Sequence, residues 1–359
     1  MADETDKRFP SVAEAFANQL AYCTANGAPI TARVCEALSA LLHQDEQAAA
    51  TAFGRRVLGW AGHPLGDGLP LRCAGGFHAL HLAGEEPDLA PLYAGEATAL
   101  ANAEKLIGAA LARHEAFLLP WLDTPPQTNE AGRSSNFAAA MLWLAQQALP
   151  PRFALNELGS SAGINLMMDR FHFDLGGVAV GPEDAAIELR PKWRGSPPPR
   201  QDIEIVSLQG ADINPIDLTD ETAAGRLKAY IWPEHPDRFH RMETAIAMAR
   251  AEPPELIRAD AADFVDTLLT GPQAPGTTRV LMHSIVWVYL PDATRQHITE
   301  AMESAGAQAT SDTPLAWIMV ESNRDTLRHE LRVRYWPGGT DWTTLGTAHA
   351  HGKWVEWSD

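Results

Sequence analysis

The pattern of apolar and polar residues changes once along the chain, at Pro150-Pro151. Before these prolines, apolar residues recur at three- and four-residue spacing, which is the period of an amphipathic helix. The spacing predicts helices at residues 9–24, 31–58, 94–118 and 134–149. No stretch before residue 152 has the character of a strand. The first part of the chain is therefore predicted to be all helical.

After the two prolines, short apolar runs alternate with helical stretches. Strands are predicted at residues 153–158, 203–208, 255–257, 280–288 and 315–320, and helices at 162–171, 219–231, 237–251, 261–269 and 292–305. This alternation is typical of a parallel sheet with helices on both faces. The last segments, residues 330–336, 341–348 and 353–357, predict antiparallel strands joined by turns that contain glycine. The fold class is therefore α/β, with a helical region at residues 1–150 and a Rossmann-like domain at residues 151–359.

Composition and charge limit the partners that the chain would bind. Its 359 residues exceed one ordinary core, which agrees with two domains, and 45% apolar residues with 21% charged ones indicate a folded protein. The formal charge is −18, from 28 basic and 46 acidic residues. Such a field repels phosphate backbones and anionic lipid, so neither nucleic acid nor a membrane is expected as a partner.

The remaining composition points to the cytoplasm and to no metal. The three cysteines (Cys23, Cys35 and Cys73) lack the spacing of a zinc site and are odd in number, which fits a reducing compartment. The start of the chain has no secretory pattern, and no apolar run is long enough to span a bilayer. The histidine pairs, at residues 78 and 81 and at residues 349 and 351, have no third ligand nearby in sequence. The oligomeric state is left open.

The residues from Glu157 to Asn165 carry the most information about function. A predicted strand ends there, a turn of small residues follows, and a helix is predicted to begin. The free amides at such a helix start bind a carboxylate, a phosphate or a ribose, and small side chains let the ligand approach. The candidate binding residues of this turn are therefore Glu157, Gly159, Ser160, Ser161, Gly163 and Asn165.

Several interpretations of this turn compete. A dinucleotide fingerprint needs a glycine where Ser161 stands, and a P-loop needs a Gly-Lys-Ser/Thr sequence that is absent. The nucleophile elbow G-x-S-x-G is matched with Ser161 as nucleophile, and Asp260 and then His283, His349 or His351 follow in the order of an α/β-hydrolase. That elbow normally follows several strands, however, whereas this turn follows the first predicted strand. The hydrolase remains an alternative.

The spacing of Glu157, Gly159 and Gly163 resembles the first motif of Rossmann-like methyltransferases that use S-adenosylmethionine. Residues 258–264 resemble the later motif of that class, in which an aspartate faces the adenine, and residues 280–284 resemble the strand beside the transferred methyl group. The resemblance implies that S-adenosylmethionine is the cofactor and that a small molecule accepts the methyl group. Ser161 replaces the usual middle glycine, so a non-catalytic binder of the same nucleoside is a second alternative.

Further candidate residues follow from what this cofactor needs. Asp212, which comes after a predicted strand, is a candidate for the ribose hydroxyls, and Asp260 with Ala261 for the adenine. Asn129 and Arg133 precede the helix that leads into the first strand and are expected to lie over the turn, where an arginine pairs with a carboxylate. For Asp212 and Asp260 a helix or turn cap is the alternative, and for Arg133 a solvated ion pair with Glu130.

His283 and Tyr289 are the candidate catalytic residues. His283 is predicted to end a central strand, where ligands of open α/β sheets bind, and an imidazole there can act as general base. Tyr289 is a candidate for the wall of the acceptor pocket. A histidine among apolar neighbours is also a common core residue, and that interpretation stays open. The N-terminal helices are expected to cover this pocket and to select the substrate.

A second resemblance covers nearly the whole chain. It is carried by Gln127-Thr128-Asn129-Glu130 with Arg133, the turn at 157–166, Leu189-Arg190-Pro191 with Trp193-Arg194-Gly195, Gly210 with Asp212 and Pro215-Ile216-Asp217, Ile231-Trp232-Pro233, and His351-Gly352 with Trp354 and Trp357. These ordered motifs resemble the bacterial family known as domain of unknown function 2332. The resemblance implies a bacterial cytoplasmic protein and no particular activity, so the function has to come from the site.

Overall fold

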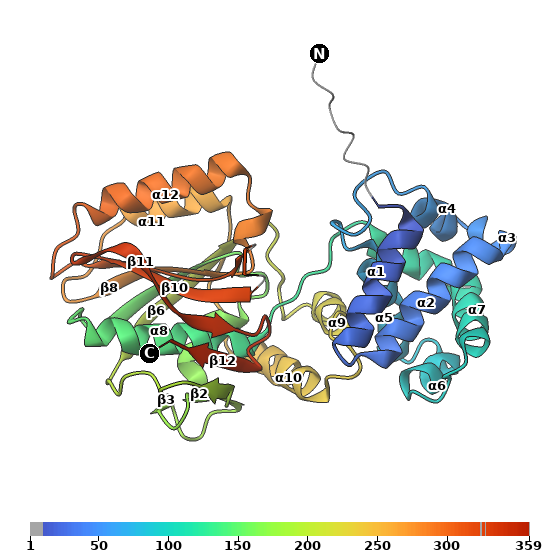
Figure 1. Cartoon of the computed structure of the whole chain (residues 1–359), viewed down its shortest axis with the longest axis horizontal. Helices are drawn as coiled ribbons and strands as arrows, with labels where there is room; N and C mark the ends of the chain where they lie inside the picture. The colour runs from blue at the N-terminus through green and yellow to red at the C-terminus, as the bar shows by residue number, and fades with distance from the viewer. Residues whose placement is uncertain (1–9, 324, 327, 359) are drawn as a thin grey trace, which may run out of the picture. The chain divides into compact units, whose positions relative to one another are not determined.

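The computed structural model describes residues 10–323, 325–326 and 328–358, which form two compact units (Figure 1). The helical unit consists of the chain up to Thr128 together with Thr222–His240, and the sheet unit of Asn129–Glu221 and the chain from Arg241. The units are thus not divided at residue 150. The helix at residues 134–146 belongs with the sheet, and the segment after residue 221 returns to the helices.

The helical unit is built from short helices around one apolar core. They are α1 (Val12–Ala25), α2 (Pro29–Gln44), α3 (Glu46–Ala49), α4 (Ala52–Leu58), α5 (Leu69–Leu82), α6 (Ala90–Tyr93), α7 (Leu100–Leu118) and α9 (Glu221–Ala229), with 3₁₀ turns η1 (Pro87–Leu89) and η2 (Leu119–Leu122). Leu38, Phe53, Phe77, Leu80 and Ile107 are fully buried in the core. None of the described helices is long and apolar enough to cross a bilayer.

Side-chain caps explain where these helices begin. The predicted helix at 31–58 is broken into three, because Asp45 and Thr51 each accept hydrogen bonds from amides of the following turn and start a new helix. The first amides of α2 have no local cap. Instead Glu234, about two hundred residues away in sequence, accepts from Ile30 N at 2.5 Å and from Thr31 N at 3.0 Å. The returning segment therefore completes the helical unit.

The sheet unit contains a nine-stranded sheet of order β7-β6-β1-β8-β9-β10-β11-β12-β5. Five strands are parallel: β1 (Arg152–Leu158), β6 (Glu204–Asp212), β7 (Leu256–Arg258), β8 (Thr278–Ser284) and β9 (Leu315–Asn323). Strands β10 (Arg328–Trp336), β11 (Gly339–Ala348) and β12 (Trp354–Trp357) continue antiparallel, and β5 (Lys192–Arg194) pairs with β12. The predicted fold class is confirmed.

The order of the parallel strands fixes where a ligand would bind. The chain runs from β1 outward to β6 and β7, and then crosses back to β8 and β9 on the other side of β1. Helices α11 (Ala261–Thr270) and α12 (Asp292–Gly306) connect β7 to β8 and β8 to β9 and lie on one face of the sheet. Helix α8 (Ser134–Gln146), which precedes β1, lies on the other face (Figure 1). The connections diverge between β1 and β8, and ligands of open α/β sheets bind at such a switch point.

Three segments of the sheet unit differ from the sequence-based expectation. Residues predicted as a helix at 162–171 form a 3₁₀ helix, η4 (Ile164–Arg170), and a second sheet of β2 (Phe171–Asp174), β3 (Ala179–Val180) and β4 (Ile187–Leu189) follows. Strand β8 ends at Ser284 and not at residue 288, because Ile285 takes a left-handed backbone conformation with φ +54°. The helix α10 (Pro236–Ala251) agrees with the prediction.

Substitution of two glycines would show how closely the C-terminal loop approaches the start of α8. Gly352 lies at this approach, and Gly276 has a similar backbone conformation in open space. Gly352 has φ +69°, and a Cβ there would lie 2.1 Å from Gly132 O, whereas Gly276 has φ +68° and nothing within 4 Å. Gly276→Ala should therefore cost about 1 kcal/mol from the backbone alone. Gly352→Ala should lower the free energy of unfolding by roughly 2 kcal/mol more than Gly276→Ala does, because its new methyl group overpacks the contact with Gly132. Urea unfolding of both variants measures the difference, and equal losses would contradict the close approach.

Candidate functional site

The turn after β1 has a left-handed backbone at every second residue. Gly159, Ser161 and Gly163 have φ values of +65°, +53° and +70°. Glycine adopts such values without strain, whereas Ser161 does so at a cost of order 1 kcal/mol or more. The serine thus keeps the backbone geometry that a glycine would have at this position. Strained residues of this kind concentrate at functional sites.

The protein itself occupies the amides of this turn. Ser160 N donates to Ala211 O at 3.1 Å, Ser161 N donates to Asp212 Oδ2 at 2.9 Å, and Ile164 N donates to Asn129 Oδ1 at 2.8 Å. Asn129 therefore lies at the turn, as the sequence analysis expected. Asp212 is also brought to the turn from the end of β6, but its contact there is with backbone. These amides are not available to a ligand while the side chains hold them.

Glu157 is a buried carboxyl group beneath the turn. It is 2% exposed, and its Oε1 accepts from Asn165 Nδ2 at 2.6 Å, while Oε2 has no hydrogen-bond partner. Burial raises the pKa of Glu157 to about 7, against the hydrogen bond from Asn165 and the positive charge of Arg133, which lower it. Asn165 Oδ1 in turn accepts from Ser134 Oγ at 2.8 Å, and Arg133 Nε donates to Ala350 O at 2.9 Å. Most of the predicted binding residues thus form one buried network.

The loop after β8 closes the other side of the turn. A Cβ on Gly159 would lie 2.4 Å from Val286 Cγ2, so the valine packs directly against the glycine backbone. One carboxylate oxygen, Glu321 Oε1, accepts from Val286 N at 3.1 Å, from Trp287 N at 3.2 Å and from His283 Nδ1 at 2.7 Å. Glu321 therefore fixes both this loop and the orientation of the imidazole.

The two predicted catalytic residues have opposite environments. His283 is completely buried, its ring stacks on Trp287 at a centroid distance of 5.0 Å, and its Nε2 has no hydrogen-bond partner. Tyr289 is 74% exposed. Glu321 was missed by the sequence analysis. Its signal was an acidic residue placed directly after the apolar run at 315–320, at the carboxyl end of a predicted strand.

Asp260 and Ala261 lie at the end of β7, on the far side of β6 from the turn. Asp260 is exposed, and its carboxylate accepts from Ala262 N at 2.8 Å as the N-cap of α11. Ala261 is the first residue of that helix and is half-buried. The capping role and a ligand contact are compatible, because a carboxylate accepts several hydrogen bonds.

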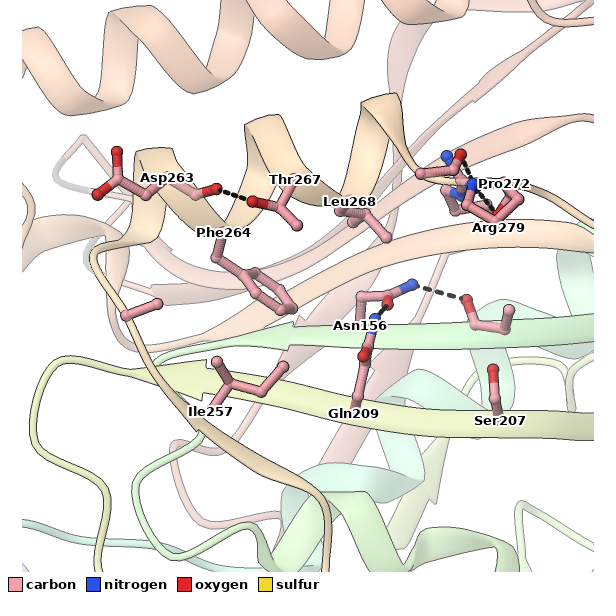
Figure 2. A pocket seen from close by; sticks show the side chains of 13 residues that line it. Asn156, Ser207, Gln209, Ile257, Asp263, Phe264, Thr267, Leu268, Pro272 and Arg279 are labelled. Carbon is pink, nitrogen blue, oxygen red and sulfur yellow. Dashed lines mark hydrogen bonds between the residues drawn. The ribbon is translucent and has the colours of Figure 1, made fainter.

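A hollow of about 350 Å³ lies between α11 and the strands β1, β6 and β7. Figure 2 shows Asn156, Ser207 and Gln209 on its floor, facing Phe264 and Leu268 of the helix. Gln209 Nε2 donates to Asn156 Oδ1 at 2.7 Å, and Asn156 Nδ2 donates to two backbone carbonyls, so the floor amides largely satisfy one another. The sequence signal was the presence of polar residues inside apolar strands.

The two histidine pairs are placed as follows. His78 and His81 lie on α5, where both rings stack with Tyr93, and His349 and His351 follow β11. Among the residues that the structure describes, no group of three or more His, Cys, Asp or Glu side chains is arranged to hold a metal ion.

Comparison with models of known protein families identifies the family of this chain. Residues 13–357 match the model of a family described as an uncharacterized protein conserved in bacteria. The chain belongs to the bacterial DUF2332 family. No curated protein and no solved structure matches this DUF2332 chain. The match spans both compact units, so the helices and the sheet together constitute the family's fold.

Glu157 gives this DUF2332 protein a specific pH dependence of stability. Its folded pKa, about 7, lies above the ordinary value of 4.5, so the folded chain keeps a proton that the unfolded chain has lost between these values. The contribution to stability is full below pH 4.5 and is lost as the pH rises through 7, a decrease of about 3 kcal/mol. Glu157→Gln should remove this decrease in denaturant unfolding measured from pH 5 to pH 8.

The control for this measurement is Glu300→Gln, because Glu300 is exposed on α12 and should leave the wild-type pH profile intact. A Glu157→Gln protein that loses stability with pH as steeply as the wild type would show that Glu157 is ionised throughout.

Proposed function

We propose that the protein binds S-adenosylmethionine at the carboxyl ends of β1, β6 and β7 and transfers its methyl group to a small molecule. The observation that carries the proposal is the position of Asp212. Its carboxylate comes from the end of β6 and lies on the turn after β1, directly beside the switch point of the sheet. A carboxylate at this place is suited to bind the two hydroxyls of a ribose.

The residues present fit the nucleoside end of this ligand better than its amino-acid end. Asp212 is half-buried and accepts one amide on each oxygen, which leaves further lone pairs for hydroxyls. Asp260 is exposed at the end of β7, where the adenine would lie. The turn amides, in contrast, are already bound, and Arg133 is 5% exposed and directed to Ala350 O. We infer that the ribose and adenine contacts supply most of the binding energy.

The cofactor itself supplies the activated methyl group, so the chain has to orient the acceptor and receive a proton. His283 is suited to the second task, because the hydrogen bond from Nδ1 to Glu321 fixes the ring and leaves Nε2 directed elsewhere. Trp287 covers the imidazole, and Val286 covers Gly159. The loop that starts at the strained Ile285 must therefore move before either residue meets a ligand.

A second function, binding of the same nucleoside without turnover, is favoured by one observation. His283 is completely buried, so the proposed base has no contact with solvent or with an acceptor in this conformation. The hydrolase alternative has no such support. No strand precedes β1 within residues 10–151, and Ser161 Oγ is buried without a hydrogen-bond partner, so no base contacts it.

Calorimetric titration with S-adenosylmethionine and with S-adenosylhomocysteine tests the binding. Asp212→Asn should weaken the binding of both ligands at least tenfold, which corresponds to about 1.4 kcal/mol of binding free energy. The reason is that the amide removes the negative charge and one hydrogen-bond acceptor. Asp266→Asn, which changes an exposed carboxylate on α11, is the matched control and should bind like the wild type. Thermal unfolding verifies that both variants fold. No heat with either ligand at millimolar concentration would overturn both binding functions.

The covering loop gives a second prediction. Val286→Ala removes the two methyl groups that pack on Gly159 and should increase the affinity for S-adenosylhomocysteine by severalfold, because less apolar contact is lost when the loop opens. Val288→Ala, an exposed valine two residues later, serves as the control. Unchanged affinity in Val286→Ala would place the ligand away from Gly159. Binding without methyl transfer across a panel of acceptors would favour the non-catalytic function.

A further inference from the structure

A cavity of about 380 Å³ opens at the carboxyl end of β9, on the face of the sheet that carries α12. We call it the tryptophan pocket, after its principal lining residues Trp287, Trp317 and Trp342, which are joined by Glu321, Glu330 and Arg332. Its volume suits a small organic molecule. It does not include the turn after β1, although it shares Trp287 and Glu321 with the surroundings of His283.

The topology explains why this part of the sheet is hollow. Strand β9 is followed by the antiparallel strand β10, whereas the connections from β6 to β7, from β7 to β8 and from β8 to β9 contain α-helices. Among the described residues after β9 there is therefore no helix to cover the face of β9, β10 and β11. Aromatic side chains stand on that face, where a helix would otherwise bury them.

The rings of the tryptophan pocket form its walls. Trp317 is 1% exposed and packs edge-to-face against both neighbours, with centroid distances of 5.5 Å to Trp287 and 5.0 Å to Trp342. The interplanar angles are 67° and 60°, so each ring is steeply inclined to the next one. Trp317 Nε1 is buried and has no hydrogen-bond partner. The three rings and one unused donor thus lie around a common space.

Two like charges face each other on the rim of this pocket. Glu321 of β9 and Glu330 of β10 are direct cross-strand partners, and both side chains lie on the pocket side. Like charges placed directly opposite on neighbouring strands destabilise a sheet. Neither carboxylate forms an ion pair with Arg332, whose guanidinium lies over the Trp342 ring at 5.1 Å. Both carboxylates have hydrogen-bond donors within the protein: Glu321 Oε1 accepts from His283 and two loop amides. Glu330 Oε1 accepts from Asn323 Nδ2 at 2.8 Å and from Thr326 Oγ1 at 3.3 Å. Two carboxylates and one guanidinium still give the lining a formal charge of −1, which a ligand cation would balance.

These observations specify the chemistry of the ligand. Tryptophan faces attract cations, and aromatic walls of this kind bind ammonium groups that carry methyl substituents. The guanidinium of Arg332 already rests on one of these rings, which shows that the ring face holds a cation in this environment. We propose that the tryptophan pocket binds a small organic cation of the tertiary or quaternary ammonium class. The carboxylates select for positive charge, and the rings for an alkylated surface.

Choline and its uncharged isostere 3,3-dimethylbutan-1-ol provide the first test, because they share a shape and differ in charge. Calorimetry or saturation-transfer NMR with the full chain, without any nucleoside present, should show that choline binds at least tenfold more tightly. Equal affinity for the two probes would overturn the proposal, as would the absence of binding at 20 mM choline. This titration is independent of S-adenosylmethionine, so its failure would leave the proposed function untouched.

Two charge variants should change choline affinity in opposite directions. Glu330→Gln removes one rim carboxylate and should weaken choline binding at least threefold. Arg332→Met removes the competing cation from Trp342 and should strengthen it by a similar factor. In both variants the affinity for the uncharged isostere should change less than the affinity for choline. Both side chains are half-buried at the rim, so the fold is expected to tolerate the changes. Effects of the same sign, or none, would contradict the assignment.

A tryptophan variant tests the wall itself. Trp342→Leu should reduce choline affinity more than tenfold. Trp354→Leu is its matched control, because Trp354 on β12 also lies under an arginine, Arg194 at 5.6 Å, but does not line the pocket. Equal choline affinity in the two variants would show that the Trp342 ring makes no contact with the ligand.

Discussion

A carboxyl group that is almost inaccessible to water stands at the end of the central strand, and the structure around the switch point depends on it. Glu157 needs a hydrogen-bond donor within reach, because an unpaired buried carboxyl group is costly. Asn165 provides that donor, and Ser134 holds Asn165. The chain after the turn is thereby drawn back against β1, and the start of α8 is drawn against both. A tight 3₁₀ helix at residues 164–170 is compatible with this constraint.

The hydrogen bonds that the protein makes to its own turn also determine how a ligand is recognised there. Since Asp212 and Asn129 occupy amides of the turn, the usual attraction between free amides and an anion is already satisfied inside the protein. Recognition then has to come from groups that retain unused acceptor capacity, the carboxylates at the strand ends. The loop held by Glu321 adds a further requirement, because the two hydrogen bonds from Val286 N and Trp287 N to Glu321 Oε1 must be broken or rearranged when the loop opens. Binding and loop movement are therefore coupled in the proposed function.

The sequence predicted the parts of the structure that depend on local patterns. The helix at 261–269 and the strand at 153–158 follow from periodicity, capping and apolar runs, and the parallel order follows from their alternation. Breaks set by single residues were predicted less well, as at Ile285, whose left-handed conformation ends β8 early. A helix was expected around His78 and His81, but its bounds were not predicted, because Gly75 and Gly76 weaken the helical pattern of α5. A Cβ at Gly75 would lie 2.6 Å from a Tyr230 ring carbon.

Contacts between distant residues account for most of what the sequence analysis missed in the site. The sequence placed Asn129 and Asp212 near the turn, since both flank elements that converge on β1. It could not show that each would bind a backbone amide, because that depends on the register between β1 and β6 and on the conformation of Ser161. It likewise could not show that His283 would be enclosed, because Trp287 and Glu321 meet it only after β9 has paired with β8.

The two pockets described above lie on the same face of the sheet. Among the residues that the structure describes, the hollow lies under α11, against β1, β6 and β7, and the tryptophan pocket lies beside α12, at β9 and β10. The floors differ because the strands differ: amide side chains on β1 and β6 satisfy one another, whereas Glu321 and Glu330 repel. The amide side chains under α11 already hydrogen-bond one another, so they need no ligand for stability. The tryptophan pocket, with two facing carboxylates on its rim, would be stabilised by a bound cation, and this difference directs the search for a ligand to the β9–β10 side.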